Sequence, residues 1–398
     1  MSVASDPVGF GVLGCGGIGR WHVRSIRSLP GLRLVAVADL DAEAARRAGR
    51  AAGVPDVPAQ ALLGSPEVEV VSICTPPRTH AQLILDVAAS GKHVLVEKPM
   101  TLNLSEADRA VSACQERGVL LGVVHQQRAR ASARVLKELI GSGALGLPLM
   151  AAVFHTWLRP VPEKLGWRGA SGEGGGVLLD QAIHAVDLLI WFLGPPRWVS
   201  GWAGGAQGSE DLAVALIGFD HDVHATLAAS ATTNRRRDDT AIELAGTRGW
   251  FRLEVRDYDH VEIAGLELVR SKGGRAEALR REEIEALVRE RGGSWRAGPR
   301  SPLWRVLGRI AGVERGRHSF RSIRGFLRRR ADRVAQLEHG ELEGHLAVLA
   351  GMGRAVRGEG PPLVDGREAR WSIAVIDGVY RSQAADGQRV NLVPLAGR

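Results

Sequence analysis

Cysteine is scarce in this sequence, and long apolar runs are missing altogether. Only three cysteines occur among 398 residues, Cys15, Cys74 and Cys114, and their odd number and wide spacing argue against a disulfide framework or a zinc knuckle. No apolar stretch is long enough to cross a bilayer, and a strand-like run begins as early as Val8, so we expect neither a membrane span nor a signal peptide. The sequence therefore predicts a cytoplasmic protein in a reducing compartment.

Length and composition are typical of a soluble globular protein. The chain is long enough for two domains with their own cores, and 45% of its residues are hydrophobic and 24% charged. The net charge of +8 is unevenly spread, because residues 270–333 hold 19 Lys and Arg against 7 Asp and Glu. The rest of the chain is therefore acidic overall, and the basic segment describes an insertion rather than the body of the protein.

Strand-like and helical runs alternate between residues 8 and 125. The apolar runs are Val8–Leu13, Leu32–Asp39, Val68–Thr75, His93–Glu97 and Val119–His125, with helices such as Asp41–Ala52, Ala81–Ala89 and Glu106–Arg117 between them. This alternation predicts right-handed βαβ units and a doubly wound parallel sheet. Ser105 and Asp108 have the spacing of a capping box for the third helix, and Gly118 is placed to end it.

The pattern changes after Arg128. A helix, a strand and an apolar helix are expected first, followed by strand-like runs that only turns separate, which is typical of an antiparallel sheet. These runs are Ser132–Ile140, Leu149–Thr156 and Val177–Leu193, then Trp198–Ala203, Leu212–Phe219, Val223–Ala231, Thr240–Ala245, Gly249–Val255 and Val261–Val269, with two helices in the tail. We therefore expect an α/β Rossmann domain over residues 1–126 and an α+β domain over 127–398 with a large, open, mainly antiparallel sheet.

A basic insertion at about 271–338 interrupts the second domain. Apolar residues from Phe320 to Leu337 fall near helical spacing among arginines, which predicts a basic amphipathic helix. Such a helix can lie on an anionic membrane, bind nucleic acid, or pack as a lid or oligomer arm. A solvated or partner-packed insertion is the interpretation we favour.

A glycine-rich turn follows the first strand. Its G-x-G-x-x-G pattern permits a tight turn and brings a helix N-terminus toward a pyrophosphate. Asp39, at the end of the second strand, can accept hydrogen bonds from ribose hydroxyls and repel a 2′-phosphate, so the sequence favours NAD over NADP, although Arg46 and Arg47 lie nearby. The predicted cofactor-binding residues here are Gly14, Gly16, Gly17, Ile18, Gly19 and Asp39.

Two further strand ends are expected to line the same crevice. Thr75, Pro76 and His80 follow one strand and can reach the nicotinamide half, although His80 is as readily a cap of the next helix. Glu97 and Lys98 end another strand, and beside a positively charged nicotinamide the charged form of a lysine is disfavoured by like charge and partial desolvation. A neutral amine at Lys98 can then take a hydroxyl proton as hydride leaves carbon.

Three polar residues interrupt the apolar helix Val177–Leu193. Asp180 and His184 are four residues apart and share one face, and Asp187 follows three residues later. We interpret His184 as a proton relay or donor to a substrate oxygen, with Asp180 orienting it. A metal site and a satisfied core histidine are the alternatives, but no cluster of further ligands is evident, so no metal is predicted.

The segment before this helix offers candidates for substrate binding. His155, Arg159 and Trp167 lie on the strand and loop that lead to the glycine run at 174–176. An indole face and a guanidinium suit a polyhydroxylated substrate, and Asp187 completes the predicted substrate-binding set.

These motifs together resemble the glucose–fructose oxidoreductase, inositol dehydrogenase and rhizopine-catabolism family of NAD(P)-dependent oxidoreductases. The matching segments are 11–19, 74–80, 94–99, the glycine run with Asp180, His184 and Asp187, and the closing 376–382. The resemblance implies that Lys98 is the catalytic lysine of a Glu-Lys-Pro motif, that Asp180 and His184 are its acid/base partners, and that the open sheet packs against another subunit in a homo-oligomer. Two departures are Ala182, where a glycine is expected, and residues 125–128, where an aromatic–Asn pattern is usual.

The motifs and the resemblance predict an NAD-dependent dehydrogenase or ketoreductase acting on a sugar, cyclitol or sugar derivative. One alternative is a glycoside-cleaving enzyme that oxidises its substrate transiently and then returns the hydride. Another is a non-catalytic dinucleotide or sugar sensor. Retention of Lys98, Asp180 and His184 argues against the sensor, which has no need of proton-transfer groups.

Overall fold

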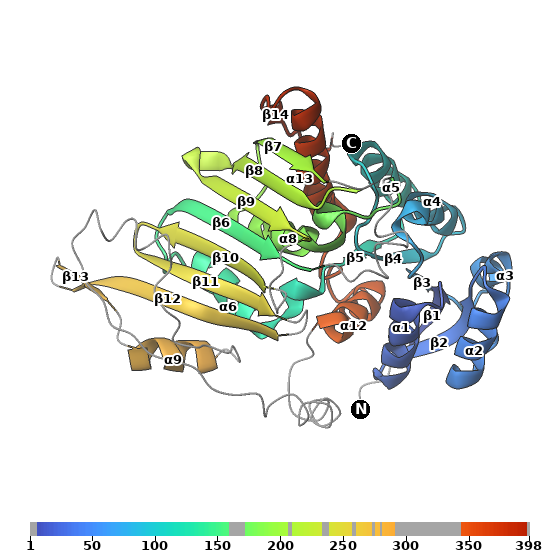
Figure 1. The fold of residues 1–398 in the computed structure, drawn as a ribbon. Helices are drawn as coiled ribbons and strands as arrows, with labels where there is room; N and C mark the ends of the chain where they lie inside the picture. The colour runs from blue at the N-terminus through green and yellow to red at the C-terminus, as the bar shows by residue number, and fades with distance from the viewer. Residues whose placement is uncertain are drawn as a thin grey trace.

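The computed structural model describes residues 6–158, 172–205, 209–232, 239–256, 260–272, 275–278, 281–290 and 344–395. Two sheets dominate this part of the chain (Figure 1): one of five strands in the order β2-β1-β3-β4-β5, and one of nine in the order β13-β12-β11-β10-β6-β9-β8-β7-β14. Within the described residues, no helix has both the length and the apolar character needed to cross a membrane.

The first sheet is parallel throughout, as predicted. Its strands are β1 (Val8–Leu13), β2 (Leu32–Ala38), β3 (Val70–Ile73), β4 (His93–Glu97) and β5 (Leu121–Val124), connected through α1 (Gly17–Ser28), α2 (Ala42–Ala52), α3 (Ala59–Gly64), η1 (Pro77–Thr79), α4 (His80–Ala89) and α5 (Leu104–Glu116). Leu13, Ile73, Val96 and Val123 pair in register from β1 to β5. The carboxyl ends of these strands therefore lie side by side, where the predicted cofactor loops begin.

The predicted cap of α5 is wrong. The helix begins at Leu104, and the side chain of Asn103 caps it by accepting from the backbone N–H of Glu106 at 2.9 Å. The Glu106 carboxylate reaches back to the N–H of Leu102 at 3.1 Å. Ser105 and Asp108 are thus already inside the helix, because Asn103, with its extended backbone, offers the side-chain oxygen two residues earlier.

The second sheet is antiparallel except where β6 runs parallel to β9, which confirms the expected mainly antiparallel sheet. Its strands are β6 (Pro148–Thr156), β7 (Trp198–Gly204), β8 (Leu212–Gly218), β9 (His224–Ser230), β10 (Asp239–Gly246), β11 (Gly249–Arg256), β12 (His260–Lys272), β13 (Arg275–Ala278) and β14 (Val390–Asn391). The helices α6 (Ala131–Gly141) and α8 (Ile183–Leu193) lie behind this sheet in Figure 1. Strands β8 and β9 are joined by the short turn η5 (Asp220–Asp222).

Part of the basic insertion is described. The chain forms β13 against the end of β12 and then α9 (Arg281–Glu290), whose first turn is acidic. The amphipathic helix predicted between Phe320 and Leu337 lies outside the described residues.

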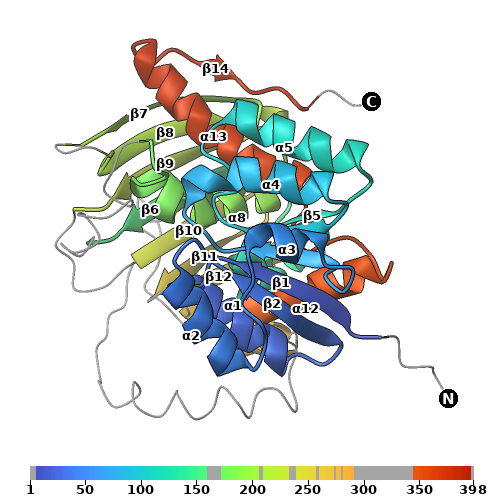
Figure 2. The same ribbon diagram turned by 90° about the vertical axis from the view of Figure 1, so that its right-hand side faces the viewer.

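The tail returns to the first sheet through α12 (Gly344–Val356) and α13 (Gly366–Ala384). Leu349 and Met352 of α12 join the core formed by Phe10 and other residues of the first sheet. Beyond α12, the N–H of Val123 in β5 donates to the carbonyl of Val364 at 3.0 Å. Figure 2 shows α13 alongside α5, and α12 packs against α1 and β5. α12 therefore completes the core of the first sheet, whereas α13 packs between α5 and strand β7 of the second sheet.

Candidate active site

The glycine turn between β1 and α1 is shaped by close backbone approach. Gly14 has φ of 94°, and a Cβ there would lie 2.7 Å from the Cys74 carbonyl; a Cβ on Gly19 would lie 1.8 Å from the Gly14 oxygen. At Gly16 and Gly17, in contrast, a Cβ would meet no atom within 4 Å. No side chain caps α1, and its first turn contains no acidic residue. The turn is thus a cradle, open on one side, with a helix N-terminus suited to an anionic diphosphate.

Asp39 is held against this turn. One carboxylate oxygen accepts from the N–H of Cys15 at 2.6 Å, and the other accepts from the N–H of Asp41 at 2.8 Å. The two arginines that could favour a 2′-phosphate are engaged elsewhere, because Arg46 and Arg47 pair with Glu43 at 2.8 and 3.5 Å. These contacts fit a dinucleotide with an unmodified ribose.

The loop after β3 lies at the same edge of the first sheet as the glycine turn. Thr75 is half-buried and Pro76 is exposed, whereas His80 is completely buried. The ring nitrogens of His80 lie 2.8 Å from the Pro99 carbonyl oxygen and 2.9 Å from that of Thr75. His80 therefore joins the Thr75 loop to the Lys98–Pro99 loop. Its buried ring makes these contacts in place of the predicted contact with nicotinamide.

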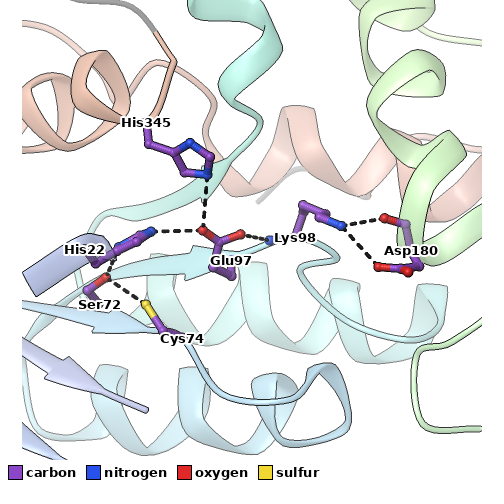
Figure 3. Close-up of polar contacts among 7 residues, drawn as sticks. All are labelled: His22, Ser72, Cys74, Glu97, Lys98, Asp180 and His345. Carbon is purple, nitrogen blue, oxygen red and sulfur yellow. Dashed lines mark hydrogen bonds and ion pairs between the residues drawn. The ribbon is translucent and has the colours of Figure 1, made fainter. Parts of the chain in front are cut away.

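Lys98 follows β4 and reaches across to the second half of the molecule (Figure 3). Its Nζ donates to the backbone oxygen of Asp180 at 2.5 Å and lies 3.4 Å from the carboxylate Oδ1. The lysine side chain is 17% exposed and that of Asp180 only 1%. The structure thus brings together two predicted catalytic residues that are 82 positions apart in the chain.

Asp180 lies in a single π-helical turn, η4 (Leu178–Ala182), which leads directly into α8. The glycines before it allow close approach: a Cβ on Gly174 would clash with Pro77 at 2.5 Å, and one on Gly176 with the Glu210 carboxylate at 2.0 Å. The Glu210 carboxylate accepts from the N–H of Leu178 at 3.1 Å. The glycine run therefore seats this turn between Glu210 and the loop after β3.

His184, on the first turn of α8, is not oriented by Asp180, contrary to the prediction. Within the described chain no hydrogen bond joins the two side chains, and the buried Nδ1 of His184 has no hydrogen-bond partner there. Its ring instead meets that of His125 edge-on, with centroids 6.5 Å apart. Burial, followed by the charge of Lys98, lowers the pKa of His184 well below its ordinary value, so the imidazole is neutral at neutral pH.

A small cavity of about 30 Å³ lies beside His184. His155 reaches it from β6, with Nδ1 2.7 Å from the Thr240 hydroxyl and a buried Nε2 that has no hydrogen-bond partner among the described residues. Burial lowers the pKa of His155 to about 4. The structure therefore places two neutral imidazoles at one cavity, whose lining is completed by Gln127, Gln181, Ala185, Leu188, Thr240 and Val255.

Asp187, which was predicted to contact the substrate, instead lies buried in an ion pair. It is 1% exposed and binds the buried Arg128 through both oxygens, at 2.7 and 2.8 Å. Arg128 also donates to Glu368 at 3.0 Å, and His125 lies 3.7 Å from Asp187. This ion pair joins η2 (Gln126–Ala129), α8 and α13 behind the site. The other two predicted substrate residues, Arg159 and Trp167, lie outside the described residues.

Glu97, predicted to bind the cofactor, points into the protein (Figure 3). Its Oε1 lies 2.9 Å from Nε2 of His22 and 3.7 Å from Nε2 of His345, and its Oε2 accepts from the N–H of Lys98 at 3.2 Å. We did not predict His22 or His345. His22 is four residues before the core residue Ile26 on α1, so a polar residue on the apolar face of that helix was the available signal.

The described residues include no group of three or more His, Cys, Asp or Glu side chains arranged to hold a metal ion. The polar groups around Lys98 are suited to proton transfer, since an amine and a neutral imidazole are available from two sides.

Comparisons with known proteins show which families the two parts of the chain match. Residues 8–125 match the family described as "Oxidoreductase family, NAD-binding Rossmann fold", and residues 133–252 match the family described as "GFO/IDH/MocA C-terminal domain". The chain is 34% identical to 1,5-anhydro-D-fructose reductase from Ensifer adhaerens over 60% of this chain and 74% of that protein. It is 28% identical to myo-inositol 2-dehydrogenase from Thermotoga maritima over 60% of this chain and 73% of that protein.

Among solved structures, the WlbA dehydrogenase from Bordetella pertussis, in complex with NADH and UDP-GlcNAcA, superimposes with a TM-score of 0.77 at 25% identity. The alignment covers 98% of this chain and 99% of that one. The likeness therefore extends over both sheets.

Proposed function

Because the chain belongs to the GFO/IDH/MocA family of NAD-binding oxidoreductases, we propose that it transfers a hydride between NAD and a secondary alcohol or ketone of a sugar, cyclitol or sugar derivative. The observation that carries this proposal is the meeting of Lys98 and Asp180, which come from the carboxyl edge of the first sheet and from the turn before α8. The relatives' names support the substrate class, since they include an anhydrofructose reductase and an inositol dehydrogenase.

We assign cofactor binding to residues 1–126 and substrate binding to residues 127–398. The open turn at Gly14, Gly16, Gly17, Ile18 and Gly19 would hold the diphosphate, Asp39 the ribose, and Thr75 and Pro76 the path toward nicotinamide. When bound, NAD supplies the hydride acceptor. All other chemistry belongs to side chains of this chain.

Lys98 and His184 then both act on the substrate oxygen. Asp180 holds the Lys98 amine at the boundary of the two sheets, where it takes the hydroxyl proton during oxidation and returns it during reduction. His184 is neutral, so it can accept or donate a hydrogen bond at the substrate oxygen without repelling the nearby lysine. His155 lies behind it across the small cavity.

The open face of the second sheet supports a homo-oligomer. Phe154, Trp202, Val214 and Leu216 are each at least 41% exposed on β6, β7 and β8. Trp202 and Val214 are paired neighbours across β7 and β8. An apolar patch of this kind marks an interaction surface, and we propose that a second copy of the chain covers it.

The test is absorbance of reduced nicotinamide across a panel of sugars and cyclitols, comparing wild type with Lys98→Met. Lys92→Met is the matched control, because Lys92 immediately precedes the same strand and its Nζ bonds the distant Ser65 carbonyl. We expect Lys98→Met to lower kcat about 10²–10⁴-fold and Lys92→Met to leave it unchanged. Undiminished activity in Lys98→Met would remove the assignment. Product formed without accumulation of NADH would instead indicate that the hydride is returned to the substrate.

A further inference from the structure

His22 is a buried polar residue that the mechanism above does not use. It lies on α1, three residues after the glycine turn ends at Gly19, and is 1% exposed. Both ring nitrogens are engaged, one with the Ser72 hydroxyl at 2.8 Å and the other with Glu97 Oε1 at 2.9 Å. His22 is therefore a direct link between the helix whose N-terminus faces the diphosphate and the strand that ends at Lys98 (Figure 3).

The link continues into the lysine itself. The second oxygen of Glu97 accepts from the backbone N–H of Lys98 at 3.2 Å, and the lysine amine is bonded to Asp180. One unbroken set of contacts thus runs from α1 through β4 to η4.

The pair is charged despite its burial. Burial opposes protonation of His22, but Cys74 and the Glu97 carboxylate outweigh it and raise the pKa of the imidazole to about 10. Burial likewise opposes ionisation of Glu97, but the hydrogen bond and charge of His22, with His345 and Lys98, lower its pKa to about 2. A buried ion pair gains little stability over apolar residues of similar volume, so stability alone does not account for it.

We propose that His22 and Glu97 are positioning residues that couple the dinucleotide-binding turn to Lys98, through the contacts of the Glu97 carboxylate with the His22 ring and with the Lys98 backbone. The proposal rests on the proposed function, since it concerns the same lysine. A change of charge at either residue is expected to reach Lys98, because Glu97 is adjacent to it and His22 lies one contact further away. Neither residue touches the reacting atoms.

The remaining groups that face Lys98 stay constant in the test. They are Asp180 from η4, His80 from α4, His125 before η2, His155 from β6 and His184 from α8. His345 from α12 approaches Glu97 from the other side and stacks near Trp21, with ring centroids 4.6 Å apart.

The experiment measures the pH dependence of kcat for NAD-dependent oxidation, with NAD affinity and thermal unfolding in parallel, for His22→Gln, Glu97→Gln, the double variant and Ser72→Ala. His22→Gln leaves the Glu97 charge uncompensated, so the acidic limb of the profile should move to higher pH. Glu97→Gln removes that charge, so the limb should move to lower pH. Each displacement should be roughly 0.5 pH unit or more, and the double variant should fall between them.

Ser72→Ala is the matched control, because it removes a hydrogen bond of His22 without changing a charge. Ser72→Ala should leave the acidic limb of the pH profile at its wild-type position. Displacements in the same direction, or no displacement, in folded variants would overturn the coupling. Should Glu97→Gln fail to fold, His22→Gln against Ser72→Ala decides alone, since only the former should move the limb upward. If Lys98→Met is inactive while these profiles coincide, the coupling fails and the proposed function stands.

Discussion

His22 on one side of Lys98 and three buried histidines on the other side differ in their partners. On the side of the first sheet, His22 is bonded to a carboxylate and a hydroxyl, and its pKa is raised to about 10. On the side of α8, His125, His155 and His184 have no hydrogen bond to a carboxylate in the described structure, and burial lowers the pKa of each. The same side chain is therefore favoured as a cation in one place and as a neutral imidazole in the other, and its neighbours decide which.

The largest expected effect comes from the neutral group. His184→Gln should lower kcat by about 10²–10⁴-fold, because an uncharged imidazole at the substrate oxygen is lost. His22→Gln should lower kcat far less, since His22 acts only through Glu97 and the Lys98 backbone. Steady-state kinetics of both variants at saturating NAD make the comparison. Equal losses would mean that the two groups do not differ in role.

The next effect concerns the buried ion pair of Arg128 with Asp187, which lies beside His125. Arg128→Met should cost about 3–5 kcal/mol of unfolding free energy, because it leaves Asp187 buried and without its bidentate partner. It should also let Asp187, now 3.7 Å from His125, raise the pKa of that histidine. Urea denaturation measures the loss, and Arg128→Met combined with Asp187→Leu is the control.

That double variant should recover part of the stability, because no unpaired charge remains. If it is as unstable as Arg128→Met alone, packing and not charge accounts for the loss.

The smallest effect is a pH dependence with opposite signs in the two groups. The unfolded chain protonates His155 near pH 6.5 and the folded chain only near pH 4, so stability falls by roughly 3 kcal/mol as pH decreases between these values. For His22 the folded pKa is raised, so its contribution is complete below pH 6.5 and is lost as pH rises through about 10. Urea midpoints from pH 4 to 10 should therefore flatten at the acidic end in His155→Leu and at the alkaline end in His22→Gln. Parallel curves for wild type and both variants would contradict the assignment of these two pKa values.

Local sequence patterns predicted the strands of the first sheet well. They did not predict contacts between residues that are far apart in the chain. The bounds of β1 and β4 coincide with the predicted runs, because apolar strands buried on both faces are bounded by glycine and charged residues. Lys98 was placed at a strand end for the same reason. The N-cap of α5 was misplaced, since several residues near 103–108 have capping side chains and only the backbone conformation selects Asn103.

Buried ion pairs could not be predicted in this way. His22 and Glu97 are 75 residues apart, and Arg128 and Asp187 are 59 apart. Helical spacing placed Asp180, His184 and Asp187 near one another, but it did not show which neighbour each would meet. Asp180 meets Lys98, Asp187 meets Arg128, and His184 meets the rings and cavity between them. These pairings depend on how the two sheets pack.

The return of α12 and α13 to the first sheet has a consequence during synthesis. Leu349 and Met352 cover part of the core around Phe10, yet about 340 residues separate them in the chain. A ribosome adding 5–20 residues per second needs on the order of 10–50 s between completing β5 and releasing α13. For that time the nascent nucleotide-binding half exposes the apolar surface that α12 covers in the folded protein. The core of that half is therefore completed only after α12 has been synthesised, and premature termination near residue 340 would leave that surface open.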